Sequence, residues 1–567
     1  MSPRGVPTLQ SLLYCTLLLT TCSLASGGAA PPPPLFPPIV TAVPGRPPSS
    51  AFTAEVFFNN SWVPVYVFES TSRAAAKAPA PTTGYFAHLE NWTASWVSSQ
   101  LPVGGGDLLL RVRRAAPGGA IRTAAAHPAT AAARVANVSA DGAVTLLATA
   151  SARIAVDMDG AMDGVDTGPS YAGPPVATFS WFVDGAPAAG LPNPAAPNTI
   201  VVRPGDALPN ASSLDPSRWP TVVFAPGVHR AAAAFPNGWA VLSLAPNTRY
   251  FLCAGAVLHA ALLDTAGAPN VTIDGFGLLS GEEMARGGAV NGSPKGIQTA
   301  LSANASLEGV TLVDFPNHHL ILGSAGGSVN RLSNVKVLGW RANGDGLHVF
   351  RNWSVADLFM RVQDDSMYLA CGENCSTTFS RVTTWNDANG CAFLFSAGGG
   401  SRERVSLVDS TVIYARASWA WWSGGRVFCH RGAFSGVVMS GVEVDGVVVE
   451  DRLPTLNAFE LDLTGDNGGG GGAPVHDAAF AGVAFRNIAV ANWSTVRKTL
   501  GGRPLPFGIP NLMFAAGARV LFENVAFDNV TIAGERVDVA GVGDAAKWNV
   551  SAADTLVNVT VDGKPLS

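Results

Sequence analysis

Gly309-Val310-Thr311-Leu312 and the later Asn334-Val335-Lys336-Val337 are two copies of the short motif that decides the fold. In most copies a Gly or Asn, which turns the chain easily, precedes a short run rich in β-branched residues. Further copies begin at Asn270, Arg381, Gly441, Gly482, Asn524 and Asn558. The closest copies lie roughly 25 residues apart, a period typical of solenoid coils, each of which needs its neighbours to close a core. The pattern predicts a right-handed parallel β-helix.

The bulk properties favour an all-β protein of more than one domain. The 567 residues are only 14% charged and include 62 Gly and 40 Pro, as expected for many strands joined by turns. Before the repeats, strand-like runs occur at 54–58, 63–68, 108–112, 144–148 and 177–183. We expect a β-sandwich over 51–200 and the β-helix over 201–567. A series of sandwich hairpins is the alternative for the second part, but Asn-Gly turns rarely separate its units.

The N-terminus has the build of a secretory signal peptide over residues 1–27. Arg4 precedes an apolar run with Leu12 and Leu18, and small residues follow around Ala25. A Pro-rich linker over 28–50 comes next. Asn-X-Ser/Thr sequons are frequent, among them Asn91, Asn137, Asn210, Asn270, Asn304, Asn352, Asn492, Asn529, Asn549 and Asn558. These features predict a secreted, glycosylated protein.

Five cysteines remain once the signal is removed. Cys371 and Cys375 bracket a short loop, and we expect a local disulfide between them. Cys391 and Cys429 could form a second disulfide, which leaves Cys253 as a buried thiol. Paired CxxC spacings and histidine partners are lacking, so we expect no metal site among these residues.

Three carboxylates lie in two polar motifs, Asn343-Gly344-Asp345-Gly346 and Gln363-Asp364-Asp365-Ser366. Their separation of about 20 residues is close to one solenoid turn, and stacked strands lie about 4.8 Å apart. We therefore expect Asp345, Asp364 and Asp365 to share one patch of surface. Crowded like charges raise at least one pKa, so one carboxyl can stay protonated while another is ionised. Acid and base hydrolysis of a glycosidic bond needs this combination.

Each motif alone is also ordinary turn chemistry. The register of the two motifs with each other favours a catalytic site over two unrelated turns. Adjacent residues of a regular strand point to opposite faces, so Asp364 and Asp365 can serve one site only across a bulge or bend.

With these residues in place, the chain resembles glycoside hydrolase family 49, the dextranase and isopullulanase family. The resemblance covers most of the chain from about residue 50 and includes the three aspartates and residues 222–229, 273–282 and 385–390. It implies a β-sandwich followed by a right-handed β-helix and an inverting hydrolysis of an α-glucan, most of all endo-hydrolysis of α-1,6 linkages in dextran. It also implies Asp364 as general acid, with Asp345 and Asp365 activating the water and with no metal or cofactor.

Two departures bear on the substrate. Tyr368 stands where family members often carry a Lys, which leaves the linkage open and keeps an isopullulanase-like activity as an alternative. The pectin-cleaving family 28 shares the spacing of the carboxylates, but its Gly-His-Gly and Arg-Ile-Lys signatures do not follow Asp365. A neutral glucan is therefore favoured over polygalacturonate.

Residues near the aspartates are candidates for sugar contacts. We expect Tyr368 and Trp385 to stack on sugar faces, and His348, Asn386 and Asn389 to supply polar contacts. A net charge of −5 without a Lys/Arg cluster gives no support to nucleic-acid binding. We expect a monomer that binds a polysaccharide, and neither nucleic acid nor a membrane.

Two other functional classes remain open. A non-catalytic matrix protein could use a β-helix as a carbohydrate-binding surface, although binding alone needs no crowded trio of carboxylates. A calcium-dependent polysaccharide lyase would also fit a β-helix with clustered carboxylates. Loss of activity with EDTA would favour the lyase.

Overall fold

The computed structural model describes much of the chain after residue 34. The described residues are 35–567 except 38, 72–92, 103–105, 116–118, 163–176, 210, 232–238, 265–266, 285–294, 300–301, 326–327, 342, 370, 372–373, 387–389, 396–403, 416–425, 431–437, 452–457, 463–477, 493–498, 501–502, 505–510, 515–519, 545–546, 551–555 and 567. The predicted signal peptide and residues 28–34 and 38 of the linker lie outside these residues, as do Asn389 and the sequons at Asn91 and Asn210.

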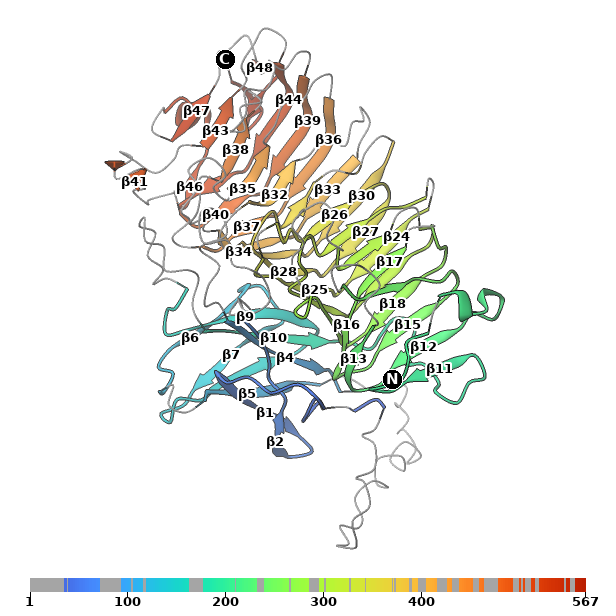
Figure 1. The fold of residues 1–567 in the computed structure, drawn as a ribbon. Coiled ribbons are helices and arrows are strands. Elements are labelled where there is room, and N and C mark those ends of the chain that lie inside the picture. Colours follow the sequence, from blue (N-terminus) through green and yellow to red (C-terminus); the bar gives the residue numbers. More distant parts are fainter. Residues whose placement is uncertain are drawn as a thin grey trace, which may run out of the picture. The chain divides into compact units, whose positions relative to one another are not determined.

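The N-terminal part is a sandwich of two five-stranded sheets (Figure 1). The first sheet contains, in spatial order, β2 (Ser61–Val65), β1 (Phe52–Phe58), β5 (Leu108–Arg114), β8 (Val144–Ala148) and β7 (Ala133–Val138). The second contains β3 (Phe68–Thr71), β4 (Thr93–Gln100), β10 (Ala177–Asp184), β9 (Ala152–Met158) and β6 (Ala124–His127). The single strand predicted over 63–68 is wrong, because the chain crosses from the first sheet to the second at Tyr66 and Val67.

Three long parallel sheets follow and form the β-helix (Figure 1). The 15-stranded sheet contains β11 (Thr199–Val202), β12 (Thr221–Phe224), β15 (Arg249–Leu252), β18 (Thr272–Gly275), β21 (Ser306–Glu308), β24 (Asn330–Ser333), β27 (Trp353–Ala356), β30 (Ser376–Ser380), β33 (Arg404–Val408), β36 (Val438–Asp445), β39 (Ala478–Arg486), β44 (Val520–Asp528), β48 (Leu556–Val557), β49 (Thr560–Val561) and β50 (Lys564–Pro565). The 12-stranded sheet contains β13 (Gly227–Arg230), β16 (Ala256–His259), β19 (Leu278–Ser280), β22 (Thr311–Val313), β25 (Lys336–Leu338), β28 (Phe359–Val362), β31 (Thr383–Asn386), β34 (Thr411–Ala415), β37 (Val448–Val449), β40 (Ala489–Val490), β45 (Thr531–Ile532) and β46 (Glu535–Arg536). The 11-stranded sheet contains β14 (Val241–Ser243), β17 (Ala261–Asp264), β20 (Ile297–Thr299), β23 (Leu320–Leu322), β26 (Leu347–Val349), β29 (Met367–Tyr368), β32 (Cys391–Phe395), β35 (Arg426–His430), β38 (Phe459–Asp462), β43 (Asn511–Phe514) and β47 (Trp548–Val550).

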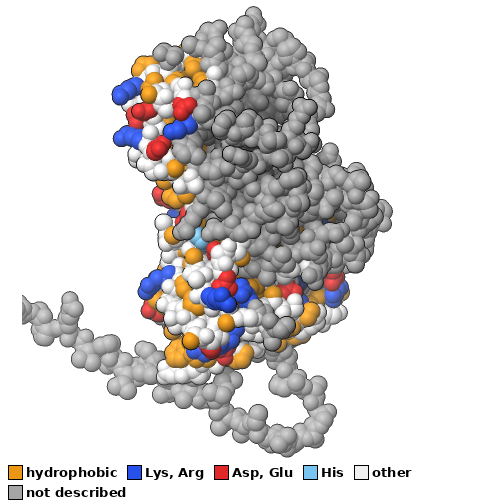
Figure 2. All heavy atoms as spheres, turned by 90° about the vertical axis from the view of Figure 1, so that its left-hand side faces the viewer, with side chains coloured by type: hydrophobic (Ala, Val, Ile, Leu, Met, Phe, Trp, Pro, Cys, Tyr) orange, Lys and Arg blue, Asp and Glu red, His pale blue; other side chains and the backbone are white. Residues whose placement is uncertain are grey.

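The remaining elements are short. They are η3 (Ala211–Ser213), η4 (Pro216–Arg218), the hairpin of β41 (Thr499–Leu500) and β42 (Arg503–Pro504), and α1 (Val539–Val542). Among the described residues no helix has the length and apolar character needed to cross a membrane. On the face shown in Figure 2, acidic and basic side chains are interspersed.

One residue with positive φ marks the turn from the 15-stranded to the 12-stranded sheet on successive coils. These turn residues are Gly309, Asn334, Asp357, Arg381, Asp409, Gly446, Asn487 and Asn529. Gly, Asn and Asp adopt this left-handed conformation most readily, which explains the Asn-Val and Gly-Val motif. The valine that follows the turn, such as Val310 or Val335, is fully buried in the core.

The copies of the motif are not all equivalent. Gly441, Gly482 and Asn524 also have positive φ, but they lie inside the long strands β36, β39 and β44. Not every copy of the motif therefore starts a new strand. The same local sequence occurs at the turn between two sheets and in the middle of a long strand, because both places need a left-handed residue next to a buried valine.

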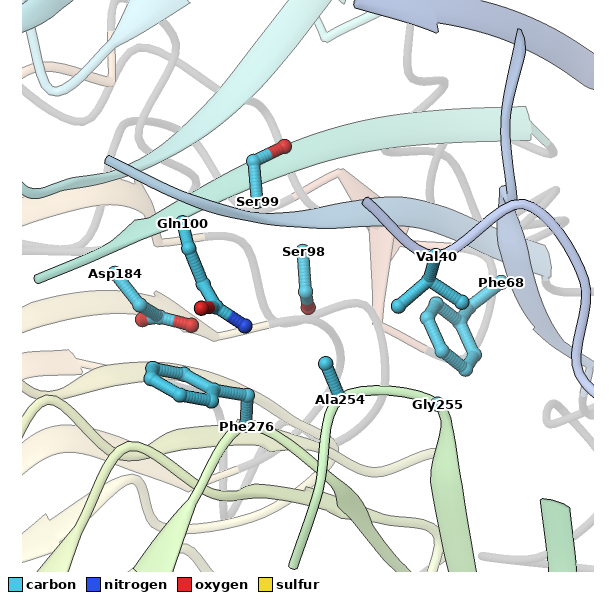
Figure 3. Close-up of a pocket in the computed structure, with 9 residues that line it drawn as sticks. All are labelled: Val40, Phe68, Ser98, Ser99, Gln100, Asp184, Ala254, Gly255 and Phe276. Atoms are coloured by element: carbon cyan, nitrogen blue, oxygen red, sulfur yellow. The ribbon is translucent and has the colours of Figure 1, made fainter. Parts of the chain in front are cut away.

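The sandwich packs against the 12-stranded sheet of the β-helix. Trp340 donates from Nε1 to the hydroxyl of Ser70 in the sandwich at 3.0 Å, and Phe182 packs edge-on against Phe359 with ring centroids 5.2 Å apart. A small pocket at this junction is lined by Val40, Phe68, Ser98, Ser99, Gln100, Asp184, Ala254, Gly255 and Phe276 (Figure 3). Its lining includes none of the three motif aspartates, so this pocket is not the candidate active site.

A buried ion pair also joins the two parts. Lys336 of β25 is fully buried, and its Nζ atom lies 2.5 Å from Oδ1 of Asp184 at the end of β10. We expect Asp184→Asn to lower the free energy of unfolding by about 3–5 kcal/mol, because the substitution leaves a buried ammonium without its counter-ion. Urea unfolding measures this loss. Asp141→Asn is the control, since the Arg113–Asp141 pair is exposed and its loss should change stability little.

Candidate active site

The three motif aspartates lie at the corner between the 12-stranded and the 11-stranded sheet. Asp345 precedes β26, while Asp364 and Asp365 lie in a bend between β28 and β29. The bend that two adjacent aspartates require is therefore present. Leu347 pairs with Met367, and the Gly346 N–H donates to the Asp365 carbonyl at 2.9 Å, so Asp345 and Asp365 occupy the same register on neighbouring coils.

This register extends over five coils and defines a site column. One residue of each coil pairs with the next along the sheet, in the order Ile297, Leu320, Leu347, Met367 and Phe393. The residue two positions before each of these belongs to the site column. The column therefore consists of Lys295, His318, Asp345, Asp365 and Cys391. His348 and Tyr368 form a second column on the adjoining strands, with ring centroids 3.4 Å apart. Lys295 and His318 are not predicted from the sequence, because only the strand register brings them to the site.

Asp345 is the most enclosed of the three carboxylates. Its Oδ2 atom lies 3.1 Å from Nδ1 of His318 and 3.2 Å from Nε2 of His348, and it accepts a 2.7 Å hydrogen bond from the Tyr368 hydroxyl. Burial opposes ionisation of Asp345, but His318 and His348 outweigh it and hold the pKa of this carboxyl well below its usual range. Asp345 is therefore ionised and able to act as a base.

Tyr368 bridges two of the aspartates. Its hydroxyl lies 2.7 Å from Oδ2 of Asp345 and 3.3 Å from Oδ2 of Asp365. Burial, together with the charges of Asp365 and Asp345, raises the pKa of Tyr368 far above its ordinary value. The phenol consequently stays protonated and donates, which ties Asp345 and Asp365 into one unit.

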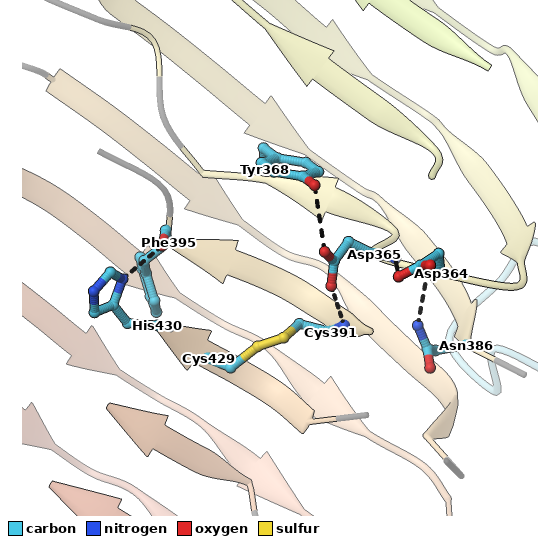
Figure 4. Close-up of a disulfide and its surroundings, with 8 residues drawn as sticks. All are labelled: Asp364, Asp365, Tyr368, Asn386, Cys391, Phe395, Cys429 and His430. Atoms are coloured by element: carbon cyan, nitrogen blue, oxygen red, sulfur yellow. Dashed lines mark hydrogen bonds between the residues drawn. A yellow bond between two sulfur atoms is a disulfide. The ribbon is translucent and has the colours of Figure 1, made fainter. Parts of the chain in front are cut away.

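Asp364 and Asp365 are fixed largely by the backbone around them. Asp364 accepts at Oδ2 from the Asn343 N–H at 3.2 Å and at Oδ1 from the Asp365 N–H at 3.0 Å. Asp365 accepts at Oδ1 from the Cys391 N–H at 2.6 Å, as Figure 4 shows. Amide donors from three coils therefore hold the pair in one orientation.

Lys295 brings a positive charge near the aspartates. The side chain is half-buried, and burial lowers the pKa of Lys295 while the nearby charge of Asp345 raises it in part. A cation beside the carboxylates offsets some of their mutual repulsion.

Two of the predicted sugar contacts do not fit the structure. Trp385 is 1% exposed and lies on β31 between Arg361, at 4.1 Å from its ring, and Tyr414, at 5.1 Å between ring centroids. It is a core residue on the side of the sheet that faces the sandwich, so the prediction that it stacks on sugar is wrong. Asn386 is also buried and donates to the Asp364 carbonyl at 3.1 Å (Figure 4), so it positions the backbone of the aspartate pair and is not open to sugar. Tyr368 and His348 are only partly buried, while Asn389 is outside the described residues.

Both expected disulfides are present. Cys371 pairs with Cys375 and Cys391 pairs with Cys429, with Cα atoms 5.9 Å and 6.1 Å apart, and Cys253 is a buried free thiol. Burial raises the pKa of Cys253 to about 12. The Cys391–Cys429 bond ties the amide that contacts Asp365 to the coil of β35 (Figure 4).

Gly390 is a packing requirement of the site. It has a φ of +76°, and a Cβ atom there would lie 2.3 Å from the Asp365 nitrogen and 2.6 Å from Asp365 Oδ1. We expect Gly390→Ala to displace the aspartate pair and lower turnover by about 10–100-fold, because small misplacements of catalytic groups are costly. The control is Gly534→Ala, which has the same φ but open space around the added methyl group. Equal activities of the two variants in a hydrolysis assay would contradict this role.

The chain was compared with protein-family models, curated proteins and solved structures. No protein-family model and no curated protein matches the chain. Among solved structures, Dex49A from Penicillium minioluteum has a TM-score of 0.68 at 18% sequence identity, over 92% of this chain and 96% of Dex49A. The polygalacturonase from Erwinia carotovora ssp. carotovora has a TM-score of 0.33 at 13% identity, over 64% of this chain and 96% of its own. The catalytic unit of the GH87 alpha-1,3-glucanase from Streptomyces thermodiastaticus has a TM-score of 0.37 at 13% identity, over 91% of this chain and 85% of that unit. The chain therefore has the fold of Dex49A, a β-sandwich followed by a right-handed parallel β-helix, as its resemblance to glycoside hydrolase family 49 predicts.

Proposed function

We propose that the protein is a secreted, inverting glycoside hydrolase that cleaves an α-glucan, with endo-hydrolysis of α-1,6 linkages in dextran as the preferred reaction. The observation that carries this proposal is the gathering of three carboxylates at one corner of the β-helix. The likeness of the fold to Dex49A supports it. Two disulfides agree with an oxidising compartment outside the cytosol.

In this proposal the three aspartates divide the acid and base work. Asp364 donates a proton to the leaving glycosidic oxygen. Asp345 and Asp365 hold the attacking water and take its proton, and the shared hydroxyl of Tyr368 keeps their oxygens aligned. The depressed pKa of Asp345 keeps this carboxyl ionised, so it can accept hydrogen bonds from the water and orient it.

The alternatives are separated by substrate and by metal dependence. Purified protein should hydrolyse dextran faster than pullulan, and it should not act on polygalacturonate. Pullulan as the best substrate would indicate the isopullulanase-like reading, while cleavage of polygalacturonate would indicate a family 28 activity. Activity lost with EDTA would favour a calcium-dependent lyase, and no turnover on any polysaccharide would favour a binding protein.

We expect the first product of hydrolysis to have inverted configuration. An α-linked glucan should release the β-anomer first, because water attacks on the face opposite the proton donor and no glycosyl-enzyme forms. Proton NMR in the first minutes of digestion, before mutarotation, measures the anomeric ratio. Dissolved free sugar, followed under the same conditions, gives the mutarotation rate as control. An initial excess of the α-anomer would show that one of the aspartates acts as a nucleophile.

A further inference from the structure

Two histidines from different coils converge on the carboxylate of Asp345. His318 precedes β23 and points Nδ1 at Oδ2 of Asp345 from 3.1 Å, while His348 of β26 points Nε2 at the same oxygen from 3.2 Å. The three ligand-capable atoms all lie within 4.8 Å of one another. We call this group the His–Asp–His cluster. The expectation of no metal site rested on sequence spacing, which does not detect ligands brought together by coil register.

Part of the binding capacity of the cluster is unused by the protein. Asp345 is 3% exposed, and its Oδ1 atom has no hydrogen-bond partner among the described residues. A buried polar atom left unpaired costs about 1–3 kcal/mol, so a ligand that engages Oδ1 of Asp345 would gain binding energy.

The donor types select the class of cation. Two imidazole nitrogens with one carboxylate suit Zn²⁺, Cu²⁺ or Ni²⁺, whereas Ca²⁺ and Mg²⁺ prefer oxygen ligands alone. Zinc bonds of about 2.0–2.2 Å in a tetrahedral site place neighbouring ligand atoms about 3.3 Å apart. The two nitrogen–oxygen separations, 3.1 Å and 3.2 Å, are close to this value, and the two histidine nitrogens, which lie within 4.8 Å of each other, would complete the site on binding. The nearby Asp365 adds negative charge, and Lys295 opposes it in part.

We propose that the His–Asp–His cluster is an inhibitory site for a zinc-class divalent cation. The cation would bind the carboxylate of Asp345 together with His318 and His348, and thereby displace the hydrogen bond from Tyr368 and block the proton acceptor. The binding site follows from the cluster alone, and only the inhibition rests on the proposed glycoside hydrolase function. The proposal differs from a cofactor role, because chelation should relieve inhibition and not abolish activity.

Titration of the purified full chain with ZnCl₂ in a non-chelating buffer tests the binding. Isothermal titration calorimetry should give one Zn²⁺ per chain, and CoCl₂ should give visible absorption bands of a nitrogen-ligated ion. His318→Ala should weaken Zn²⁺ binding at least about tenfold, since it removes one ligand. Asp345→Asn preserves the size of the side chain and tests the site even if the alanine variant does not fold. His127→Ala is the matched control, because His127 forms a similar contact with Glu450, at 2.9 Å, away from the cluster.

The outcomes separate the site from the proposed function. The site is supported if one equivalent of Zn²⁺ binds the unmodified chain and His127→Ala but no longer binds His318→Ala and Asp345→Asn. This result does not depend on whether a glucan is hydrolysed. Inhibition of hydrolysis by Zn²⁺ that EDTA reverses supports the inhibitory role. The site is overturned if Zn²⁺ does not bind stoichiometrically, or if binding is unchanged in both cluster variants. The inhibitory role is overturned if Zn²⁺ binds but does not inhibit an active enzyme.

Discussion

Asp364→Asn is expected to lower turnover on the preferred glucan by about 10²–10⁴-fold, because a positioned proton donor contributes that much to glycoside cleavage. The amide has almost the same shape as the carboxyl group, and its single oxygen can keep one of the two backbone contacts, from Asn343 or from Asp365. Initial rates on dextran measure the loss. Circular dichroism and thermal unfolding should match the unmodified protein.

A substrate with an activated leaving group sharpens this test. An aryl glycoside that leaves without protonation should lose much less activity in Asp364→Asn than dextran does, since it does not need the acid. Asp409→Asn is the control, because Asp409 is an exposed left-handed turn residue where asparagine fits equally well. Unchanged turnover on dextran in Asp364→Asn would remove Asp364 from the acid role.

The fold follows from local chemistry that the sequence displays. A left-handed turn between two sheets demands Gly, Asn or Asp, and the next residue must fill the core, so the motif recurs wherever a coil turns. Parallel pairing then follows, since each coil can bury its apolar residues only against its neighbours. The sequence could not show that Gly441 and Gly482 lie inside strands, because the local requirement is the same there.

The site was only partly predictable for a related reason. Asp345 and Asp365 were found because their motifs are distinctive and one coil apart. His318 and Lys295 belong to the same site column. The loops between the strands vary in length, so counting a fixed number of residues back from Asp345 does not locate them in the sequence. Only the pairing of β20, β23, β26 and β29 reveals them.

Burial of Trp385 illustrates a second limit. Alternation along β31 indicates two faces of the strand, but it does not say what covers the outer one. In the structure the sandwich lies on that side, and Arg361, which stacks on Trp385, also contacts Thr178 of β10. An aromatic residue beside a catalytic motif can therefore be a core residue between domains, and its sequence neighbourhood does not distinguish this from a sugar platform.

The second large effect concerns the two aspartates that share Tyr368. We expect Asp345→Asn and Asp365→Asn each to lower kcat by about 10²–10⁴-fold, and the double variant to be little worse than the more damaging single variant. Their Oδ2 atoms accept from one hydroxyl, at 2.7 Å and 3.3 Å, so loss of either charge disrupts the same water position. Once that position is lost, the second substitution has little left to remove.

A double-mutant cycle on kcat measures this coupling. The combination of Asp345→Asn with Asp409→Asn is the control pair, and its effects should multiply because Asp409 lies at a turn outside the site. Tyr368→Phe should lower activity and should also bring the effects of the two aspartate substitutions closer to independence, since it removes their common hydrogen bond. A double variant that loses the full product of the two single losses would mean that Asp345 and Asp365 act separately. In that case one of them would serve a role other than activation of the water.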